Sequence, residues 1–298
     1  MSLFDQLVDH ALAAKSDLAP LRVVVEKELL HHDILREMSA AGLLAELTFI
    51  GGTCLRACYG SNRLSEDLDF TGGQGFQRER LADLGRVLVV KLEKKYGLQV
   101  EVSDPVKESG QVDTWKLRVI TRPEQRNLPS QRIHIDICAI PSYDRRPLLL
   151  RNPYDVDMGT AGLFVQAQSR EEILADKLLA FALRPNRVKS RDLWDIAWLK
   201  QQQVELPLDL VPKKISDHRQ TAAAFVAQLA ARRGQLQENP SMRVEFMAEM
   251  RRFLPVRVVT ETVENPDFWP YLANLVGAEV DRTMGYLSGK SESLPFRM

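Results

Sequence analysis

The chain has 298 residues, of which 45% are hydrophobic and 27% are charged. This composition excludes a disordered protein and is typical of one large or two ordinary folded domains. The 40 basic and 40 acidic side chains give a formal net charge of zero. A nucleic-acid partner would therefore need a local basic surface, because the field of the whole molecule offers no attraction.

The sequence predicts no membrane segment and no secretory leader. Its longest apolar runs, such as residues 148–150, are far too short to cross a bilayer, and the N-terminal residues lack an apolar signal-peptide core. The three cysteines, Cys54, Cys58 and Cys138, show neither paired spacing nor a neighbouring histidine cluster. They favour reduced, buried thiols. We expect a cytoplasmic protein with no membrane partner, and the sequence predicts no particular oligomeric state.

In chain order, the hydrophobic pattern predicts helices first and a sheet next. Apolar residues at helical spacing predict helices within residues 1–45, with Gly42 as a stop signal. The predicted elements that follow are strands at 47–50 and 68–71, a helix over 76–96 that ends at Gly97, and strands at 98–103, 115–121 and 132–140. The last two strands predict a hairpin. This order predicts an α+β sheet domain over residues 1–165.

From Ser169 onward the pattern is helical and is interrupted by prolines. The interrupting residues are Pro185, Pro207, Pro240, Pro255 and Pro266. Because proline cannot continue a helix interior, each of these positions predicts a break between helices. We therefore predict a second, helical domain over residues 166–298.

The stretch 49–70, FIGGTCLRACYGSNRLSEDLDF, combines a pair of glycines with closely spaced acids. Asp67 and Asp69 lie two residues apart at a strand edge, so their carboxylates share a face about 7 Å apart. Such a pair, together with a third carboxylate, suits the divalent metal ions of polymerase-type sites. Asp136 is the best third candidate, because an acid in an apolar strand is costly unless it is paired or binds a metal.

The glycines of the same stretch suit a phosphate. Gly51 and Gly52 allow the backbone to approach a ligand closely. A helix that begins at Thr53 would direct its free amides at an anion bound there. The alternative interpretation is a turn with solvated acids that follows a glycine pair.

Residues 169–199 form a second informative stretch. Ser169 and Glu172 give the capping-box signal of a helix start. On that helix Lys177 falls within the apolar stripe. A lysine in such a position either extends to solvent or contacts an anion, which can be a ligand or a partner carboxylate.

A basic run follows, and a further helix begins after it. The run contains Arg184, Arg187, Lys189 and Arg191 with no acid between them. It suits phosphate binding, and a solvated loop is the alternative. Asp192 and Asp195 then lie three residues apart on one side of the new helix. Compensation of the helix N-terminal charge is an alternative role for Asp192.

These motifs resemble those of a known family. The glycine pair followed by D-h-D-h resembles motif I of the DNA polymerase β-like nucleotidyltransferases. With ADKLLA and RDLWD further on, the string GGTCLRACYGSNRLSEDLDF resembles the AbiEii/AbiGii toxin family, the nucleotidyltransferase half of type IV toxin–antitoxin pairs, to which MenT-type toxins also belong. Glu26 and Lys27 resemble the family too, whereas Ile50 stands where members often carry lysine. The resemblance spans roughly residues 22–200.

The resemblance implies a polymerase β-like nucleotidyltransferase domain, with a mixed sheet flanked by helices, and a helical C-terminal domain that completes the active site. It implies transfer of a nucleoside monophosphate from an NTP, with Mg²⁺ or in its place Mn²⁺, to the 3′ end of tRNA. A cognate antitoxin is the implied protein partner. The alternatives are the same chemistry on a protein or a small molecule, or a non-catalytic nucleotide-binding module.

The resemblance also assigns roles to individual residues. Lys177 matches the motif lysine that contacts nucleotide phosphates, and Arg118 and Asp136 fall where the strand motif with the third carboxylate is expected. The predicted catalytic residues are Asp67, Asp69, Lys177 and Asp192, and the predicted metal ligands are Asp67, Asp69 and Asp136. The predicted substrate-binding residues are Gly51, Gly52, Thr53, Ser65, Arg118, Arg187, Arg191 and Asp195.

Overall fold

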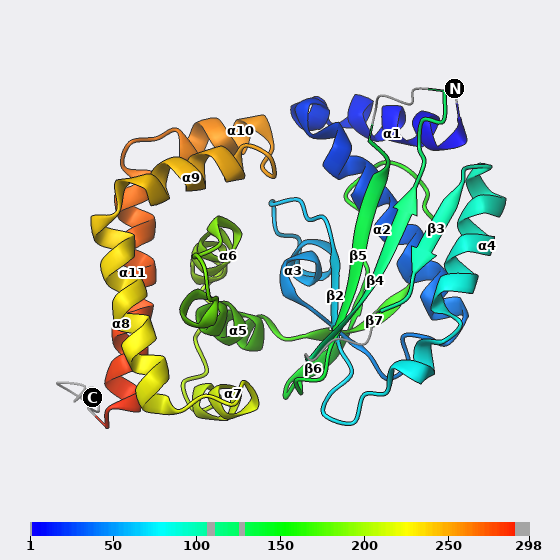
Figure 1. Cartoon of the computed structure of the whole chain (residues 1–298). Coiled ribbons are helices and arrows are strands. Elements are labelled where there is room, and N and C mark those ends of the chain that lie inside the picture. Colours follow the sequence, from blue (N-terminus) through cyan, green and yellow to red (C-terminus); the bar gives the residue numbers. More distant parts are fainter. Residues whose placement is uncertain (1, 106–110, 125–128, 290–298) are drawn as a thin grey trace. The chain divides into compact units, whose positions relative to one another are not determined.

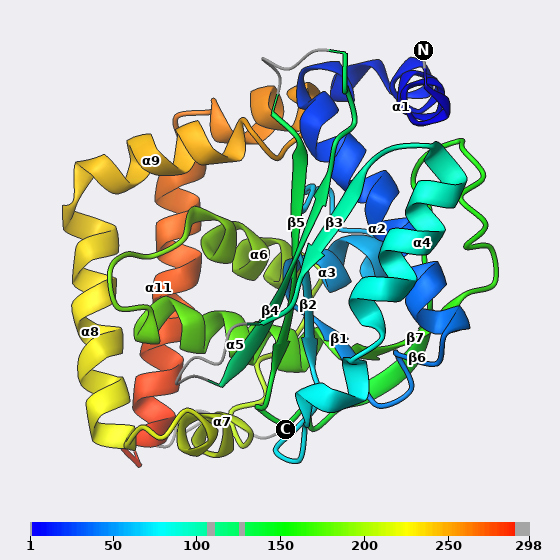
Figure 2. The same ribbon diagram turned by 45° about the vertical axis from the view of Figure 1, so that its right-hand side comes forward.

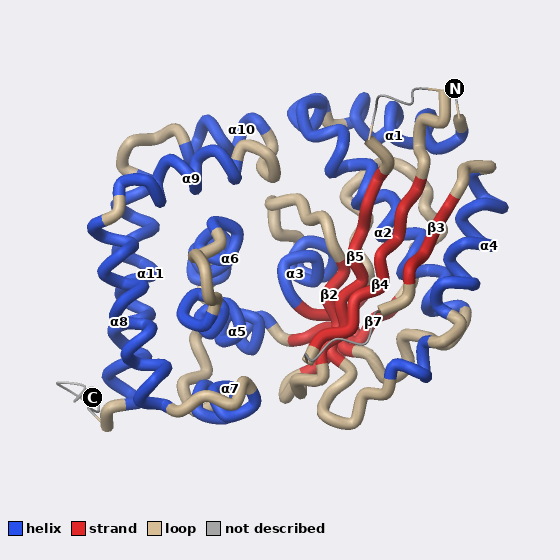
Figure 3. The backbone as a smooth tube through the Cα atoms, in the orientation of Figure 1, coloured by secondary structure: helices blue, strands red, loops and turns tan. Residues whose placement is uncertain are grey.

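The computed structural model describes residues 2–105, 111–124 and 129–289, and the chain divides into two compact units. Unit 1 is Met1–Gln168 together with Phe253–Arg257, and unit 2 is Ser169–Arg252 together with Val258–Met298. The short return segment is tied into unit 1 by a hydrogen bond from the Leu64 amide to the Phe253 carbonyl (2.8 Å). Figure 3 shows that the strands belong to unit 1 and that unit 2 is built from helices.

The helices of unit 1 are shorter than the sequence pattern predicts. They are α1 (Leu3–Ala14), the 3₁₀ helix η1 (Ser16–Leu21), α2 (Arg22–Ala40), α3 (Gly51–Tyr59), the 3₁₀ helix η2 (Arg78–Leu81) and α4 (Leu84–Tyr96). The first helical region is broken at Lys15, and Pro20 lies within the 3₁₀ turn that follows. The helix predicted over 76–96 is regular only from Leu84. Its predicted end is confirmed, because Gly97 adopts a left-handed φ of 64° as the C-cap.

In the described part of unit 1, seven strands form one mixed sheet. They are β1 (Thr48–Ile50), β2 (Leu68–Thr71), β3 (Val100–Ser103), β4 (Val112–Val119), β5 (Gln131–Cys138), β6 (Arg145–Leu149) and β7 (Phe164–Gln168), in the spatial order β3-β4-β5-β2-β1-β7-β6. The β2–β5 and β1–β7 pairs are parallel and the others antiparallel. The predicted β4–β5 hairpin is confirmed, and β6 and β7 were not predicted.

The two faces of the sheet differ in burial. Ile133, Ile135 and Ile137 of β5 are at most 1% exposed, on the face along which α2 and α4 run (Figures 1 and 2). The side chains between them, His134 and Asp136, are exposed or half-buried. This alternation arises because successive strand residues point to opposite sides of the sheet.

Unit 2 contains α5 (Arg170–Leu183), α6 (Ser190–Gln201), α7 (Val211–Asp217), α8 (Ala222–Glu238), α9 (Pro240–Met250), the one-turn α10 (Val256–Val258, which begins in the return segment), the π-helix η3 (Val259–Val263) and α11 (Phe268–Leu287). The long helices α8 and α11 lie side by side (Figures 1 and 2). The predicted helix start at Ser169 is confirmed, because the Ser169 hydroxyl accepts a hydrogen bond from the Glu172 amide (3.2 Å). Among the described residues, no helix has the length and apolar character needed to span a membrane.

Candidate active site

The start of α3 is open to an anion. Ile50 ends β1 in an extended conformation, and α3 begins at once with Gly51, two residues before the predicted start at Thr53. The N-cap residue, Ile50, makes no side-chain capping hydrogen bond to this helix start. The first amides of a helix have no intrahelical acceptor and carry a partial positive charge. The start of α3 can therefore donate hydrogen bonds to a phosphate.

Gly51 is required at this position for two reasons. Its φ is +75°, in the left-handed region that other residues adopt only with strain. A Cβ atom added at Gly51 would lie 2.9 Å from Oδ2 of Asp69. The glycine therefore lets the start of α3 lie directly against the Asp69 carboxylate.

The strand register places two predicted metal ligands side by side. Asp69 of β2 pairs with Ile50 of β1 on one side and with Asp136 of β5 on the other. Neighbouring strands lie about 4.8 Å apart, and directly paired residues point to the same face. Asp136 in turn pairs with Thr114 of β4, whose hydroxyl donates a hydrogen bond to Asp136 Oδ1 (2.6 Å). We call the Asp69–Asp136–Thr114 line the acidic row.

Asp67 lies one step along the same face, just before β2 begins. Its Oδ1 accepts a hydrogen bond from the backbone amide of His134 (2.9 Å), and Nδ1 of the same residue lies 3.7 Å away. The Asp67 side chain is 35% exposed. The residue is thus anchored through one oxygen at an exposed position.

The chemistry of these acids fits Mg²⁺ brought in with a nucleotide. Carboxylate oxygens are the hard ligands that this ion prefers, and it is commonly held by one or two carboxylates together with substrate phosphates. Among the described residues, no group of three or more His, Cys, Asp or Glu side chains is arranged to hold a metal by itself. The donor set therefore fits a metal whose remaining ligands come from the substrate.

The side-chain hydroxyls of Thr53 and Ser65, both predicted to bind substrate, make hydrogen bonds within unit 1. The Thr53 side chain is only 2% exposed, donates to the carbonyl of Asp67 and lies 2.6 Å from the Ser65 hydroxyl. The Ser65 amide donates to Oε1 of Glu28 (3.0 Å). These contacts tie α3 and α2 to the loop that carries Asp67.

Glu28 is the centre of a buried polar cluster that the sequence did not reveal. The Arg56 Nε lies 3.1 Å from both of its oxygens, and the Tyr154 hydroxyl donates to Oε2 (2.6 Å). Burial raises the pKa of Tyr154, and the neighbouring Glu28 raises it further. Burial alone would lower the pKa of Arg56, but Glu28 and Tyr154 outweigh it and raise that pKa. Glu28 therefore lies between a guanidinium cation and a phenol hydroxyl that donates a hydrogen bond to it.

Two adjacent histidines of α2 lie behind the same loop. His31 Nε2 is 3.0 Å from the carbonyl oxygen of Glu66, whose carboxylate pairs with Lys27 (3.0 Å). His32 Nδ1 is 3.0 Å from the Thr160 hydroxyl. Burial lowers the pKa of both imidazoles, that of His32 to about 4. Both rings are therefore neutral at pH 7.

In unit 2, Lys177 meets partner carboxylates. Its Nζ lies 2.8 Å from Asp192 Oδ1 and 2.8 Å from Asp195 Oδ2. The lysine side chain is 12% exposed and the two acids at most 3%. Of the predicted alternatives for a lysine within an apolar stripe, contact with a partner carboxylate is therefore the one observed.

Residues of the basic run are also paired within unit 2. The Arg184 Nε donates to Asp192 Oδ2 (2.9 Å), and Arg191 pairs with Glu249 (3.1 Å). Burial alone would raise the pKa of Asp192, but Lys177 and Arg184 outweigh it and lower that pKa to about 2. Arg187 is exposed.

The family model of the AbiEii nucleotidyltransferase toxins of type IV toxin–antitoxin systems matches residues 33–274. The chain belongs to this family. It is therefore a nucleotidyltransferase, as its motifs predicted, and its family is the toxin side of a toxin–antitoxin pair. The match includes both motif regions of the sequence and most of unit 2.

The solved structure of a toxin supports the fold assignment. MenT4, a nucleotidyltransferase toxin from Mycobacterium tuberculosis, is similar over 97% of this chain and 94% of its own, with 17% identity and a TM-score of 0.55. JHP933 from Helicobacter pylori is similar over 88% of this chain and 97% of its own, with 14% identity and a TM-score of 0.44. No curated protein matches the sequence significantly. The predicted α+β nucleotidyltransferase fold is confirmed.

Within this AbiEii member, the predicted residues fall into separate groups. Gly51, Asp69 and Asp136 are brought together in unit 1, with Asp67 one step away. Arg118 lies four residues along β4 from Thr114, which is about 13 Å. The cysteine prediction holds for the buried Cys54 and Cys58, but Cys138 is only half-buried because it lies on the face of the acidic row.

Proposed function

We propose that this AbiEii member transfers a nucleoside monophosphate from an NTP to the 3′ end of tRNA in a Mg²⁺-dependent reaction. The observation that carries the proposal is the direct pairing of Asp69 with Asp136, beside the uncapped start of α3. The placement joins a phosphate-binding helix start to a pair of metal-binding carboxylates. The choice of tRNA rests on the motif resemblance.

The residues of unit 1 suit an in-line displacement. The amides at the start of α3 would hold the phosphates, and Gly51 would let them approach Asp69. Bound Mg²⁺ would supply charge neutralisation between the phosphates and the carboxylates. Asp136 would accept the proton of the acceptor hydroxyl, whose oxygen forms a bond to the α-phosphorus as the bond to pyrophosphate breaks. Catalysis would consist mainly of positioning and electrostatic stabilisation.

The proposal keeps a functional role for two residues of unit 2. The motif resemblance assigns Lys177 and Asp192 to catalysis, and the two form an ion pair with each other. A lysine held between two carboxylates is fixed in position, which suits a residue that must present one donor to an anion. The test of this role is the kinetic effect of substitution, measured apart from its effect on folding.

The acceptor is tested directly by incubating the purified chain with total tRNA and each labelled NTP in turn. We expect label on tRNA with one preferred NTP, release of pyrophosphate, and complete loss of both on chelation of divalent metal ions. Restoration by added Mg²⁺ or Mn²⁺ is the matched control. Mass spectrometry of RNA and protein from the same reactions distinguishes a tRNA acceptor from a protein or small-molecule acceptor.

The toxin role has a separate test in cells. Expression of the chain should arrest growth, and Asp69→Ala should abolish the arrest without lowering the level of folded protein. A cognate antitoxin should relieve the arrest caused by the unaltered chain. Growth arrest that persists in Asp69→Ala would separate toxicity from nucleotidyl transfer.

A further inference from the structure

The exposed face of the β4–β5 hairpin is basic next to the acidic row. Lys116 pairs with His134 across the two strands, and Arg118 pairs with Arg132. All four side chains are exposed and lie on the same face as Asp136, since they are an even number of residues from Asp136 or its partner Thr114. Successive rows are about 6.7 Å apart along the strands. We call Lys116, Arg118 and Arg132 the basic strip.

The basic strip leads into a groove between α2 and the end of the hairpin. The groove has a volume of about 810 Å³. Its charged lining residues are Arg22, Lys27, Arg118, Arg122, Arg132 and the acid Glu26. The groove therefore adjoins the strip beyond its last row, and Arg118 and Arg132 belong to both.

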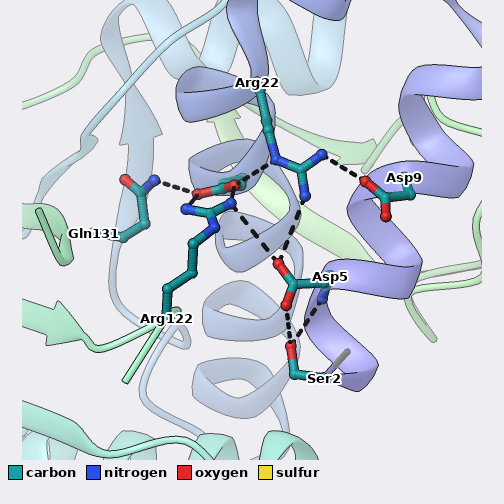
Figure 4. A network of polar contacts seen from close by, with 7 residues as sticks. Ser2, Asp5, Asp9, Arg22, Arg122 and Gln131 are labelled. Atoms are coloured by element: carbon teal, nitrogen blue, oxygen red, sulfur yellow. Dashed lines mark hydrogen bonds and ion pairs between the residues drawn. The ribbon is translucent and has the colours of Figure 1, made fainter. Parts of the chain in front are cut away.

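The one acid of this lining is neutralised from within the fold. Glu26 is fully buried and accepts hydrogen bonds from Arg22 Nε (3.1 Å), Arg122 and Gln131 Nε2 (2.5 Å). Figure 4 shows Arg22, Arg122 and Gln131 converging on one carboxylate, with Asp5 and Asp9 of α1 also in contact with Arg22. A buried carboxylate with such partners fixes both guanidinium groups in the wall of the groove.

Other acids pair with the lining cations, and the excess of positive charge lies on the strip. Asp5 pairs with both Arg22 and Arg122, and Asp9 pairs with Arg22. Glu66 pairs with Lys27, and Glu101 pairs with Arg118. Within the ranges that the structure describes, exposed Lys116 and Arg132 have no ion-pair partner. An anion that follows the strip therefore meets two cations whose charge is not compensated by the protein.

We propose that the basic strip binds the backbone phosphates of a single-stranded RNA acceptor, which extends from the acidic row into the groove. The inference rests on the proposed function, because it takes the nucleotide acceptor to be RNA. Two basic rows at regular spacing suit a repeating phosphate backbone better than the single triphosphate of an NTP, which the start of α3 can hold. Such contacts supply affinity without reading sequence.

The test measures RNA binding apart from catalysis. In full-length Asp69→Ala protein, the affinity for total tRNA and for an oligonucleotide of its 3′ end is measured against salt concentration. We compare Lys116→Gln/Arg118→Gln/Arg132→Gln with Arg86→Gln/Lys91→Gln/Lys94→Gln, a matched loss of three exposed cations on α4. Circular dichroism and thermal melting verify that each variant is folded.

The strip variant should bind RNA with a flatter salt dependence. Each phosphate contact contributes about 0.7 to the slope of log affinity against log salt for a single strand, so three lost contacts flatten it by about 2. The plots of log affinity against log salt for the parent protein and the strip variant meet at about 1 M salt. The strip variant should therefore bind RNA about a hundredfold more weakly than the parent at about 0.1 M. The α4 variant should match the parent protein.

Other outcomes separate this inference from the proposed function. Equal slopes in the strip and α4 variants would overturn the inference even if tRNA is the acceptor. In the active chain, a raised KM for the NTP with unchanged RNA affinity would assign the strip to the triphosphate and would also overturn it. Strip-dependent RNA binding without transfer to RNA would instead support the RNA site and refute the proposed acceptor.

Discussion

The acids predicted as site residues have different kinds of partner in the two units. In unit 2, Asp192 and Asp195 are almost fully buried and both contact Lys177. In unit 1, Asp67 and Asp136 accept hydrogen bonds from a backbone amide and a threonine hydroxyl, and the Asp67 side chain is 35% exposed. Carboxylates paired with internal cations have their charge compensated within the fold, whereas carboxylates that accept hydrogen bonds from neutral donors on an open face suit an external cation.

The largest expected effect is on catalysis in unit 1. Asp69→Asn or Asp136→Asn should lower kcat/KM for nucleotide transfer about a thousandfold or more, because a metal-binding carboxylate supplies several kcal/mol of transition-state stabilisation. Asp113→Asn, on the same sheet and half-exposed, is the control and should retain activity. Near-normal transfer by both acidic-row variants would refute the metal-site proposal.

The next effect concerns the buried charges of unit 2. Lys177→Met should lower the free energy of unfolding by about 3–5 kcal/mol, because it leaves Asp192 and Asp195 buried without that cation. Urea unfolding followed by circular dichroism measures the loss. Arg187→Met, at an exposed position, should change it by less than about 0.5 kcal/mol.

The same variants test whether Lys177 also acts on the nucleotide. Lys177→Met/Asp192→Asn/Asp195→Asn should recover much of the lost stability, because all three charges are removed together. Kinetics at temperatures where this triple variant is folded then isolate the catalytic role. Normal transfer by the folded triple variant would contradict a catalytic role for Lys177 and Asp192.

Acidification should affect the two units in different pH ranges. His32 has a folded-state pKa of about 4, below the ordinary 6.5, so protonation favours the unfolded chain and stability falls from about pH 6.5 to pH 4. Asp192 has a folded-state pKa of about 2 against 3.8, so its contribution is present above pH 4 and is lost towards pH 2. The respective losses are about 3 and about 2 kcal/mol.

Single substitutions separate these contributions. His32→Gln should flatten the stability curve between pH 6.5 and 4, and Asp192→Asn should flatten it between pH 4 and 2. Urea unfolding of each variant across the pH range provides the measurement. If both variants retain the slope of the unaltered chain in their windows, the burial of these groups does not control acid stability.

The smallest expected effect on stability comes from glycine substitutions, which distinguish backbone strain from the close approach of Gly51 to Asp69. Gly51→Ala and Gly73→Ala both place a side chain at positive φ, +75° and +74°, which costs about 1–2 kcal/mol in each case. Only at Gly51 does the new Cβ meet Asp69, whereas at Gly73 it has open space. Unfolding assays should show similar losses of stability for the two variants. Transfer assays should show a loss of activity for Gly51→Ala alone. Equal activities would refute the role of close approach.

Much of the sheet could be predicted because its pattern is local. The apolar residues of β5 predicted that strand, and Gly97 marked the end of α4. Strand β6 was not predicted, because its sequence, RRPLL, is mostly exposed and does not alternate between apolar and polar residues. The helix predicted over 76–96 contains no proline, and its break lies directly before Asp83, the N-cap residue of α4.

The partners of the polar residues could not be predicted in the same way. Glu28 lies among ordinary α2 residues in the sequence, yet it contacts Arg56, Ser65 and Tyr154 from three later segments. The sequence also gave no reason to expect that the Thr53 hydroxyl would be used to hold the loop before Asp67. Such contacts depend on how helices pack, which hydrophobic periodicity does not specify.

The sequence by itself determined the chemistry of this protein: a glycine pair, closely spaced acids and a lysine motif identify a nucleotidyltransferase. The tertiary structure decided which charges are satisfied internally. Asp69 and Asp136 lie 67 residues apart and become neighbours through a parallel strand register, whereas Lys177 meets Asp192 through the packing of two helices. The sequence specifies the type of each residue, but its electrostatic partners follow from strand register and helix packing, which are properties of the whole fold.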